Sequence, residues 1–256
     1  MTPAELSGLW RRDYLKPANA PADTSTWVGW LQGRRYYCDL RQPAALPDLS
    51  HVRRLTDLTR DDLRSLAGQQ GFAGELTVRN GTAHWQRLYD FQPDSGVADR
   101  ATLEQTGDLL LETGTEQPYV EQWTRSEGRV SDSFGALLTD TVAGCRGIVV
   151  RAGPWLMYAR ERRTVLPAGR SLLELLELLD AHQCLDSARA LLDFEISFGT
   201  LQSATAWHVI RSTLPYKAGK TWGIELPVAE AANVVISDID SEGRPLVRVW
   251  RVTQQD

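Results

Sequence analysis

Hydrophobic and polar residues alternate along most of the chain. Short runs rich in Val, Thr, Trp and Tyr are separated by Gly, Pro, Asn and Asp. A period of two residues, bounded by turn residues, is typical of β-strands. In the first half this pattern predicts strands at residues 9–15, 27–32, 36–41, 74–78, 84–91, 108–113 and 119–125. Asn80-Gly81 predicts a tight hairpin turn, because the two central residues of that turn take positive φ.

Two segments have the spacing of helices instead. The first covers about residues 60–69 and follows Thr59, with Asp62 three residues on. The second begins at Ser171, with Glu174 at the capping-box position. Leucines fill most positions from 172 to 179 and cover more than one face. Such a stripe could bind a partner helix, but we interpret it as core packing.

The two halves of the chain repeat the same order of features. Residues 72–93 resemble residues 192–215, since each segment has an early strand glutamate, then a Trp beside a His, then a Pro. Residues 27–41 likewise resemble residues 147–163. The matched pairs, 120 to 127 residues apart, are Tyr37 with Tyr158, Glu75 with Glu195, Trp85 with Trp207, and Trp123 with Trp250. Landmarks in one order at nearly one offset predict an internal duplication.

A meander of antiparallel strands exposes unpaired edges unless it closes into a barrel. We therefore predict an all-β fold of two tandem antiparallel barrels, with one or two short helices in each repeat. Residues 126–134, "SEGRVSDSF", form the most polar and turn-like stretch in mid-chain. The predicted domains are accordingly residues 1–128 and residues 129–256.

The start of the chain adds a family resemblance. Gly8-Leu9-Trp10 resembles the Gly-x-Trp opening of lipocalin-like (calycin) barrels. The order W-x-R-x-Y, then "WLQ", then "DLR", resembles an uncharacterised fungal and bacterial family of two tandem lipocalin-like barrels. This resemblance implies that Trp10 plugs the closed end of the first barrel beneath Arg125 of its last strand. An Arg over an indole face is favourable by roughly 0.5–2 kcal/mol. The second half has no recognisable Gly-x-Trp opening.

Aromatic and basic side chains fall together on the predicted strands. Because side chains alternate between the lumen and the outside of a barrel, residues two apart share a face. Sets that share a face are Trp85, Arg87, Tyr89 and Phe91; Tyr37, Asp39 and Arg41; and Tyr119, Glu121, Trp123 and Arg125. They could either close the barrel or line a pocket.

We predict that one such set binds a small, flat or weakly acidic ligand. Rings supply contact area at low entropic cost, and guanidinium groups can hold an anionic end. The predicted ligand-binding residues are Trp30, Tyr37, Trp85, Arg87 and Tyr89. The counterpart of Arg87 in the second repeat is Val209, so the pocket is expected in the first unit alone.

Catalytic and metal-binding motifs are missing from the sequence. It contains no nucleophile elbow, phosphate-binding loop, dinucleotide fingerprint or zinc-protease motif. With four histidines in the chain, a multi-histidine metal site is not expected, and neither is a cofactor. The weak candidates for acid–base chemistry are Glu75, Glu195, His84 and His208, since a carboxylate in a partly apolar barrel can have a raised pKa.

Composition narrows the classes of function. The net charge of −5 argues against a general nucleic-acid binder. No signal peptide is visible, and no apolar stretch reaches the length of a membrane span. Three cysteines without a C-x-x-C pair indicate a reducing cytoplasm. Three hypotheses remain: a small-molecule binding protein, a metal-independent lyase, isomerase or cyclase, and a protein-interaction scaffold. The oligomeric state stays open.

Overall fold

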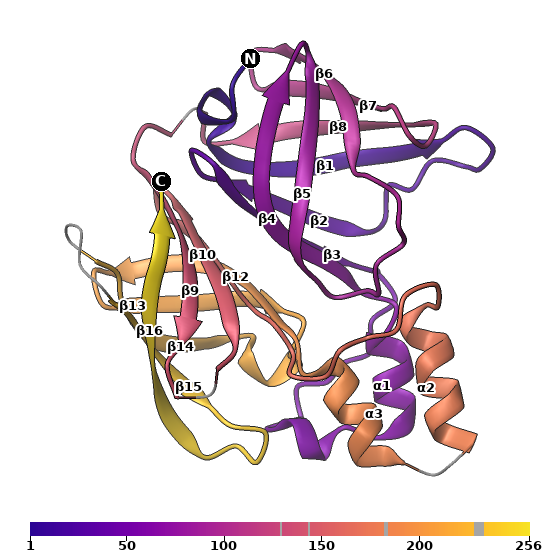
Figure 1. The fold of residues 1–256 in the computed structure, drawn as a ribbon, viewed down its shortest axis with the longest axis vertical. Coiled ribbons are helices and arrows are strands. Elements are labelled where there is room, and N and C mark those ends of the chain that lie inside the picture. Colours follow the sequence, from indigo (N-terminus) through magenta and orange to yellow (C-terminus); the bar gives the residue numbers. More distant parts are fainter. Residues whose placement is uncertain (129, 143, 182–183, 228–232) are drawn as a thin grey trace.

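The computed structural model describes residues 1–128, 130–142, 144–181, 184–227 and 233–256. They form two closed antiparallel barrels, each with strands in sequential order, beside a group of three helices (Figure 1). The prediction of an all-β fold of two tandem barrels is therefore confirmed.

Each barrel contains eight strands, and β1 pairs with β8 to close the first one. The strands of the first barrel are β1 (Gly8–Pro17), β2 (Trp27–Gln32), β3 (Tyr36–Gln42), β4 (Gln70–Arg79), β5 (Thr82–Asp90), β6 (Arg100–Thr106), β7 (Leu109–Gly114) and β8 (Tyr119–Ser126). Positive φ values at Asn80 and Gly81 form the predicted hairpin turn. Strand β6 was not predicted, because its polar sequence lacks aromatic residues, Val and Ile.

The second barrel repeats this topology, with β9 paired to both β10 and β16. Its strands are β9 (Ser133–Asp140), β10 (Arg146–Ala152), β11 (Trp155–Arg160), β12 (Glu195–Ser203), β13 (Ala206–Ser212), β14 (Lys220–Glu225), β15 (Asn233–Ile239) and β16 (Pro245–Gln255). Strand β9 is the opening strand that the sequence left undefined. Ala136 is buried inside this barrel, whose first strand carries no Trp.

A shared β-bulge aligns the two repeats. The register shifts beside Gly74 in the first barrel and beside Gly199 in the second. A Cβ atom at either glycine would lie about 2 Å from a carbonyl oxygen of the facing strand, at 2.0 Å and 1.9 Å respectively, so only glycine fits. Gly74 pairs with Arg87 and Gly199 with Val209, so Trp85 is equivalent to Trp207, as predicted.

The same alignment corrects the match between the two glutamates. Glu75 follows Gly74 directly, and the residue that follows Gly199 is Thr200 rather than Glu195. Glu75 lies on the outer face of its strand, while Glu195 lies on the same face as Ser197, which pairs with the lumen residue Tyr158. The two glutamates therefore point to opposite sides of their barrels.

Three hydrophobic clusters make up the core. Two fill the barrel interiors, and the third lies between the barrels and extends into the helices. Strands β2 and β3 are buried on both faces, with Trp30 and Tyr37 inside the first barrel and Leu31, Tyr36 and Cys38 in the third cluster. The dense aromatic sequence of these strands thus serves two cores.

The helices join the two repeats. Helix α1 (Arg60–Leu66) follows β3, while α2 (Leu172–Ala181) and α3 (Leu185–Leu192) follow β11, and the three pack together (Figure 1). Thr59 and Asp62 form the predicted cap of α1. Leu172, Leu175 and Leu176 are buried in the cluster between the barrels, which agrees with core packing. In the part of the chain that the structure describes, no helix combines the length and apolarity of a membrane span.

Candidate ligand-binding site

One end of the first barrel is sealed by Trp10. The 3₁₀ helix η1 (Pro3–Leu6) lies at this end, and the carbonyl oxygen of Leu6 accepts a hydrogen bond of 2.7 Å from Trp10 Nε1. The Arg125 guanidinium carbon lies 4.4 Å from the centroid of the Trp10 ring. The ring of Trp30 stacks on Trp10, with the two ring centroids 5.8 Å apart. Trp10 is fully buried. These are the positions that the family resemblance implied for Trp10 and Arg125.

Above this seal, aromatic rings form the floor of the lumen. Trp30 lies at the centre, with its ring centroid 5.7 Å from that of Trp85 and 5.6 Å from that of Trp123, both edge to face. Tyr37 and Phe72 form a further edge-to-face pair at 6.2 Å. Edge-to-face pairs of this kind are favourable beyond the area they bury. The lower half of the barrel is therefore a rigid, filled core.

The other end of the first barrel is open. A pocket of about 210 Å³ lies at this mouth, with Arg41, Arg87, Asp99, Tyr119 and Glu121 among its lining residues. Below it, a chamber of about 10 Å³ is lined by the rings of the floor and by Asp39, Arg41, Asp99 and Glu112. Arg41 and Asp99 line both, so the chamber continues the pocket downward. Since a cavity needs roughly 10–15 Å³ to hold one water, the chamber has room for about one water and the pocket for several.

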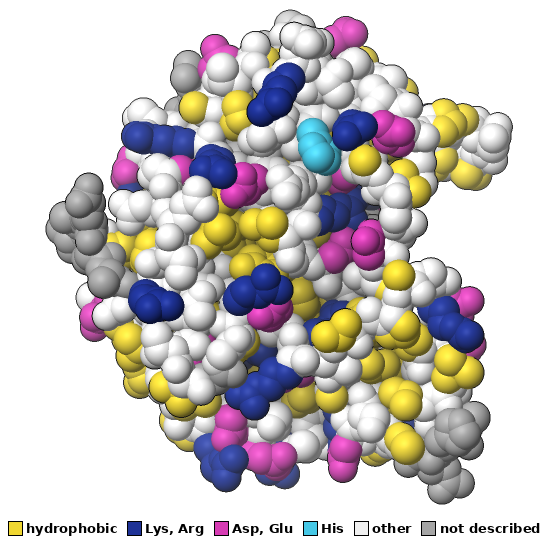
Figure 2. All heavy atoms as spheres, viewed as in Figure 1, with side chains coloured by type: hydrophobic (Ala, Val, Ile, Leu, Met, Phe, Trp, Pro, Cys, Tyr) yellow, Lys and Arg dark blue, Asp and Glu magenta, His cyan; other side chains and the backbone are white. Residues whose placement is uncertain are grey.

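Most guanidinium groups at this end are held by two carboxylates, and Arg100 is held by one, Glu116 at 3.3 Å. Arg12 contacts Glu121 at 2.8 Å and Asp23 at 2.7 Å. Arg41 contacts Asp39 at 2.8 Å and shares Glu121 at 3.4 Å. Elsewhere on the molecule, Figure 2 shows basic and acidic side chains lying next to each other on the visible surface. Fixed pairs of this kind orient side chains and leave little free positive charge.

Arg87 is held in the same way at the rim. Its guanidinium contacts Asp99 at 2.7 Å and Asp90 at 2.9 Å, and lies 3.6 Å from the ring of Phe72. Arg87 therefore caps the aromatic floor, but its charge is already compensated by two carboxylates.

Glu112 differs from the other acids of the site. It accepts hydrogen bonds from the Tyr119 hydroxyl at 2.7 Å and from Trp123 Nε1 at 3.0 Å, and it makes no ion pair within the described residues. Its cross-strand neighbour is Glu121. Burial, and then the charge of Glu121, raise the pKa of Glu112 well above its usual value. Burial also raises the pKa of Tyr119, assisted by Glu112.

Four of the five predicted ligand-binding residues lie at this site. Trp30, Tyr37 and Trp85 line the chamber, and Arg87 lines the pocket. Tyr89 does not, because the bulge opposite Gly74 interrupts the alternation of β5 and turns Tyr89 to the outer face. It packs there in the cluster between the barrels. The expectation for Tyr89 is therefore wrong.

The predicted acid–base residues lie elsewhere. Glu75 is bound to Arg35 at 2.7 Å on the outer face. His84 and His208 neighbour the lumen residues Trp85 and Trp207, so they too lie on outer faces, and His208 contacts Thr221 at 3.2 Å. Glu195 belongs to the second barrel. None of the four lines the pocket or the chamber.

Sequence reasoning missed several charged residues of the site. The shared faces of Asp39 with Arg41, and of Tyr119 with Glu121, were visible in the strand pattern. Glu112 had no such signal, because "LLLETG" contains a single charged residue without a partner in the sequence.

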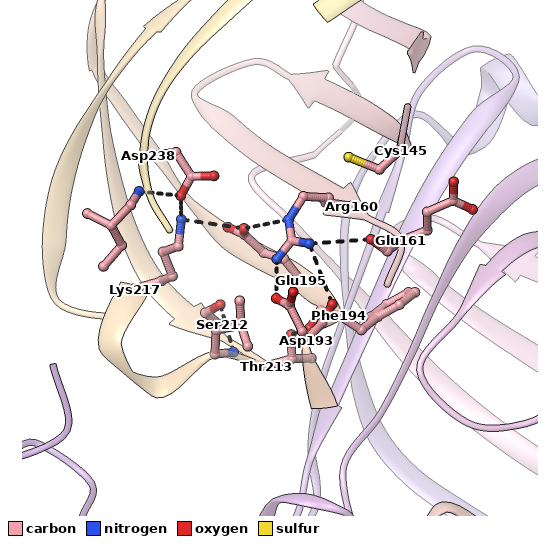
Figure 3. Close-up of polar contacts among 12 residues, drawn as sticks. Cys145, Arg160, Glu161, Asp193, Phe194, Glu195, Ser212, Thr213, Lys217 and Asp238 are labelled. Carbon is pink, nitrogen blue, oxygen red and sulfur yellow. Dashed lines mark hydrogen bonds and ion pairs between the residues drawn. The ribbon is translucent and has the colours of Figure 1, made fainter. Parts of the chain in front are cut away.

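The equivalent end of the second barrel is closed. The 3₁₀ helix η3 (Pro215–Lys217) places Lys217 against Asp238 and 3.5 Å from Glu195, and all three side chains are buried (Figure 3). Arg160 completes the network through Asp193 at 2.7 Å and Glu195 at 3.8 Å. Burial lowers the pKa of Lys217 to about 8, although the charge of Glu195 opposes the shift. Packed side chains thus occupy the place that corresponds to the open mouth of the first barrel.

The described residues include no group of three or more His, Cys, Asp or Glu side chains placed to hold a metal ion. The candidate site therefore combines aromatic rings, paired guanidinium groups and the buried carboxyl group of Glu112, whose pKa is raised.

Comparison with known proteins supports the fold. No family model matches the sequence, and no curated protein matches it significantly. Among solved structures, the chain is similar to the uncharacterised protein YLR301w of Saccharomyces cerevisiae, with a TM-score of 0.50 and 10% sequence identity. The similarity covers 97% of this chain and 98% of the yeast chain. At this identity the likeness concerns the arrangement of the two barrels.

Proposed function

We propose that this protein binds a small organic molecule at the mouth of its first barrel. The observation that carries the proposal is the difference between the two repeats. The first barrel has a pocket of about 210 Å³ above an aromatic floor, whereas η3 and its ion network fill the same end of the second. Neutral sequence change after a duplication does not by itself explain why one barrel is open and the other filled at the same end.

A lipocalin-like barrel is the corresponding proposal for the fold family. The observation in its favour is the sealed end, where Arg125 of the last strand stacks on Trp10 of the first. Barrels of this size often hold one small ligand at the open end. Trp10 and Arg125 are then structural residues, and the ligand contacts lie at the opposite end.

The lining favours a ligand with a flat or aromatic body. Trp30, Trp85 and Phe72 offer ring faces and edges that are held rigidly by their neighbours. Rigid rings lose little entropy when a ligand packs on them. An anionic end is not supported, because Arg87 is already bound by Asp90 and Asp99.

Binding is favoured over the catalytic and scaffold hypotheses. None of the residues singled out for acid–base chemistry reaches the pocket, which removes the sequence basis for a lyase or isomerase. A protein-interaction scaffold does not require a pocket above a rigid aromatic floor.

Trp85→Leu tests the proposal, with Trp207→Leu as its matched control. Both residues are buried at equivalent positions, but only Trp85 lines the chamber. We expect Trp85→Leu to weaken binding of an aromatic ligand by about tenfold or more, as loss of a central aromatic contact does. Trp207→Leu should bind like the wild type. Isothermal titration calorimetry against a panel of small aromatic compounds measures both.

Equal affinity of the two variants would contradict a site in the first barrel. Failure of the wild type to bind any member of the panel would contradict small-molecule binding as a whole. Circular dichroism of both variants checks that they are folded, since each change removes a buried ring.

A further inference from the structure

We propose that the ligand is a small organic cation, a primary amine on a flat body, whose ammonium group enters the chamber beside Glu112 and Tyr37. This inference rests on the proposed function and specifies the class of ligand. The body of the ligand then occupies the wider pocket above.

The charge balance of the site is the first argument. Four guanidinium groups, those of Arg12, Arg41, Arg87 and Arg100, are surrounded by seven carboxyl groups. The seven are Asp23, Asp39, Asp90, Asp99, Glu112, Glu116 and Glu121. Even with Glu112 protonated, the carboxylates outnumber the guanidinium groups. An anion would be repelled here, and a cation would be drawn in.

The aromatic floor is the second argument. Trp30, Trp85 and Trp123 converge on the chamber with Tyr37 and Phe72. Ring faces attract ammonium groups through their quadrupole, most strongly for Trp, and the attraction grows when the site is shielded from water. A floor of indoles below a ring of carboxylates combines the two features that recognise an organic ammonium group.

The third argument is an unpartnered hydroxyl group. Tyr37 is fully buried and lines the chamber, and its hydroxyl has no hydrogen-bond partner within the described residues. Burial raises the pKa of Tyr37 well above its usual value, so the group stays a phenol. A buried polar group without a partner costs about 1–3 kcal/mol. An ammonium group has three donors, one of which can be accepted by the Tyr37 oxygen and another by a Glu112 oxygen.

The size of the chamber limits the cationic group. A chamber of about 10 Å³ holds about one water-sized group. A primary ammonium group has that size, whereas a guanidinium or a trimethylammonium group is larger. The inference is therefore specific to primary amines.

Glu112 couples this binding to pH. The groups that face it are Tyr119 and Glu121, with Asp99 and Arg41 further off. Burial and the charge of Glu121 raise the pKa of Glu112, so its protonated form persists to higher pH than that of an ordinary glutamate. An ammonium group beside it favours the ionised carboxylate, so binding releases a proton. Amine affinity should therefore rise as the pH increases toward the raised pKa of Glu112 and level off above it.

Matched ligands test the inference in the wild-type protein. Each set consists of an amine, an alcohol and a carboxylic acid that carry the same substituent. The substituents of the three sets are phenylethyl, indolylethyl and hexyl. Calorimetry is expected to give amine affinities at least tenfold above those of the alcohols, with the acids weakest, and a rise in amine affinity with pH. Alcohols or acids that bind as tightly as the amines would overturn the cation while leaving small-molecule binding intact. If no compound binds, both proposals fall.

Substitutions of two residues at the mouth are expected to change amine affinity in opposite directions. Glu112→Gln keeps the shape and an oxygen that accepts from Tyr119, although its NH₂ group cannot accept from Trp123. It is expected to weaken amine binding about tenfold, to abolish its pH dependence and to leave the alcohols unchanged. Arg87→Met frees Asp90 and Asp99, and is expected to strengthen amine binding severalfold. The control is Glu104→Gln, an exposed glutamate on β6 that should change nothing. Amine binding unaffected by Glu112→Gln, or weakened by Arg87→Met, would overturn the inference. If Glu112→Gln does not fold, the wild-type pH profile decides the point.

Discussion

Replacing Trp10 with Ala is expected to lower the free energy of unfolding by about 3–5 kcal/mol, the usual cost of removing a large ring from a core. Trp10 is fully buried, donates a hydrogen bond to Leu6 and packs between Arg125 and Trp30. The change leaves a cavity at the sealed end of the barrel. It also removes the surface on which Arg125 stacks, so a buried guanidinium group loses a neighbour.

Urea denaturation measures this loss, with Trp10→Phe as the matched variant. Phenylalanine keeps an aromatic ring under Arg125 but cannot donate to Leu6, so a loss of about 1–2 kcal/mol is expected for it. An unfolding midpoint of Trp10→Ala close to that of the wild type would contradict the role of Trp10 as the seal. A loss in Trp10→Phe equal to that in Trp10→Ala would show that the hydrogen bond, not the packing, is decisive.

The second large effect is expected in the other barrel. Arg160→Met should destabilise the protein by about 3–5 kcal/mol, because removing one partner of a buried ion pair leaves the other charge without compensation. Arg160 is buried and contacts Asp193 at 2.7 Å and Glu195 at 3.8 Å (Figure 3). Its pKa is raised, since the attraction of Asp193 and Glu195 outweighs the cost of burial. Among the described residues, Lys217 would then be the remaining cation within 4.0 Å of Glu195, while Asp238 would keep both Lys217 and Arg248.

Arg146→Met is the control for this prediction. Arg146 forms an ion pair of similar geometry with Glu161, at 2.8 Å, but its side chain is 62% exposed. Exposed pairs contribute at most about 1 kcal/mol, so the control should unfold almost like the wild type. High salt should also weaken the Arg146 pair more than the Arg160 network, because buried charges are screened less. Equal losses in the two variants would mean that the network of the second barrel is effectively solvated.

These two ends give the repeats different roles. In the first barrel the mouth is open and its charged residues surround a pocket, while in the second the corresponding Arg160 is locked by η3 and its neighbours. Strands β9 to β12 of the second barrel also pack against β2 and β3. We infer that it serves as the structural support that keeps the rings of the first barrel in place.

The architecture could be predicted from the amino-acid sequence. Alternation of apolar and polar residues located most strands of the first barrel, Asn80-Gly81 located a hairpin, and Thr59 and Ser171 located two helix starts. These signals are local, because a strand face, a tight turn or a cap depends on residues close together in the chain. The duplication was also readable, since Trp85 and Trp207 keep the same place beside a bulge in both repeats.

Which of these residues contact one another depends on the three-dimensional fold. A single bulge at Gly74 reversed the direction of Tyr89, and no local pattern marks where a strand will insert an extra residue. The burial of both faces of β2 and β3 required a second barrel to pack on the first. Glu112 joined the site because β7 pairs with its neighbour β8, which brings it beside Tyr119, Glu121 and Trp123. Contacts of this kind depend on the register between strands, so alternation along each strand predicts the faces but not their neighbours.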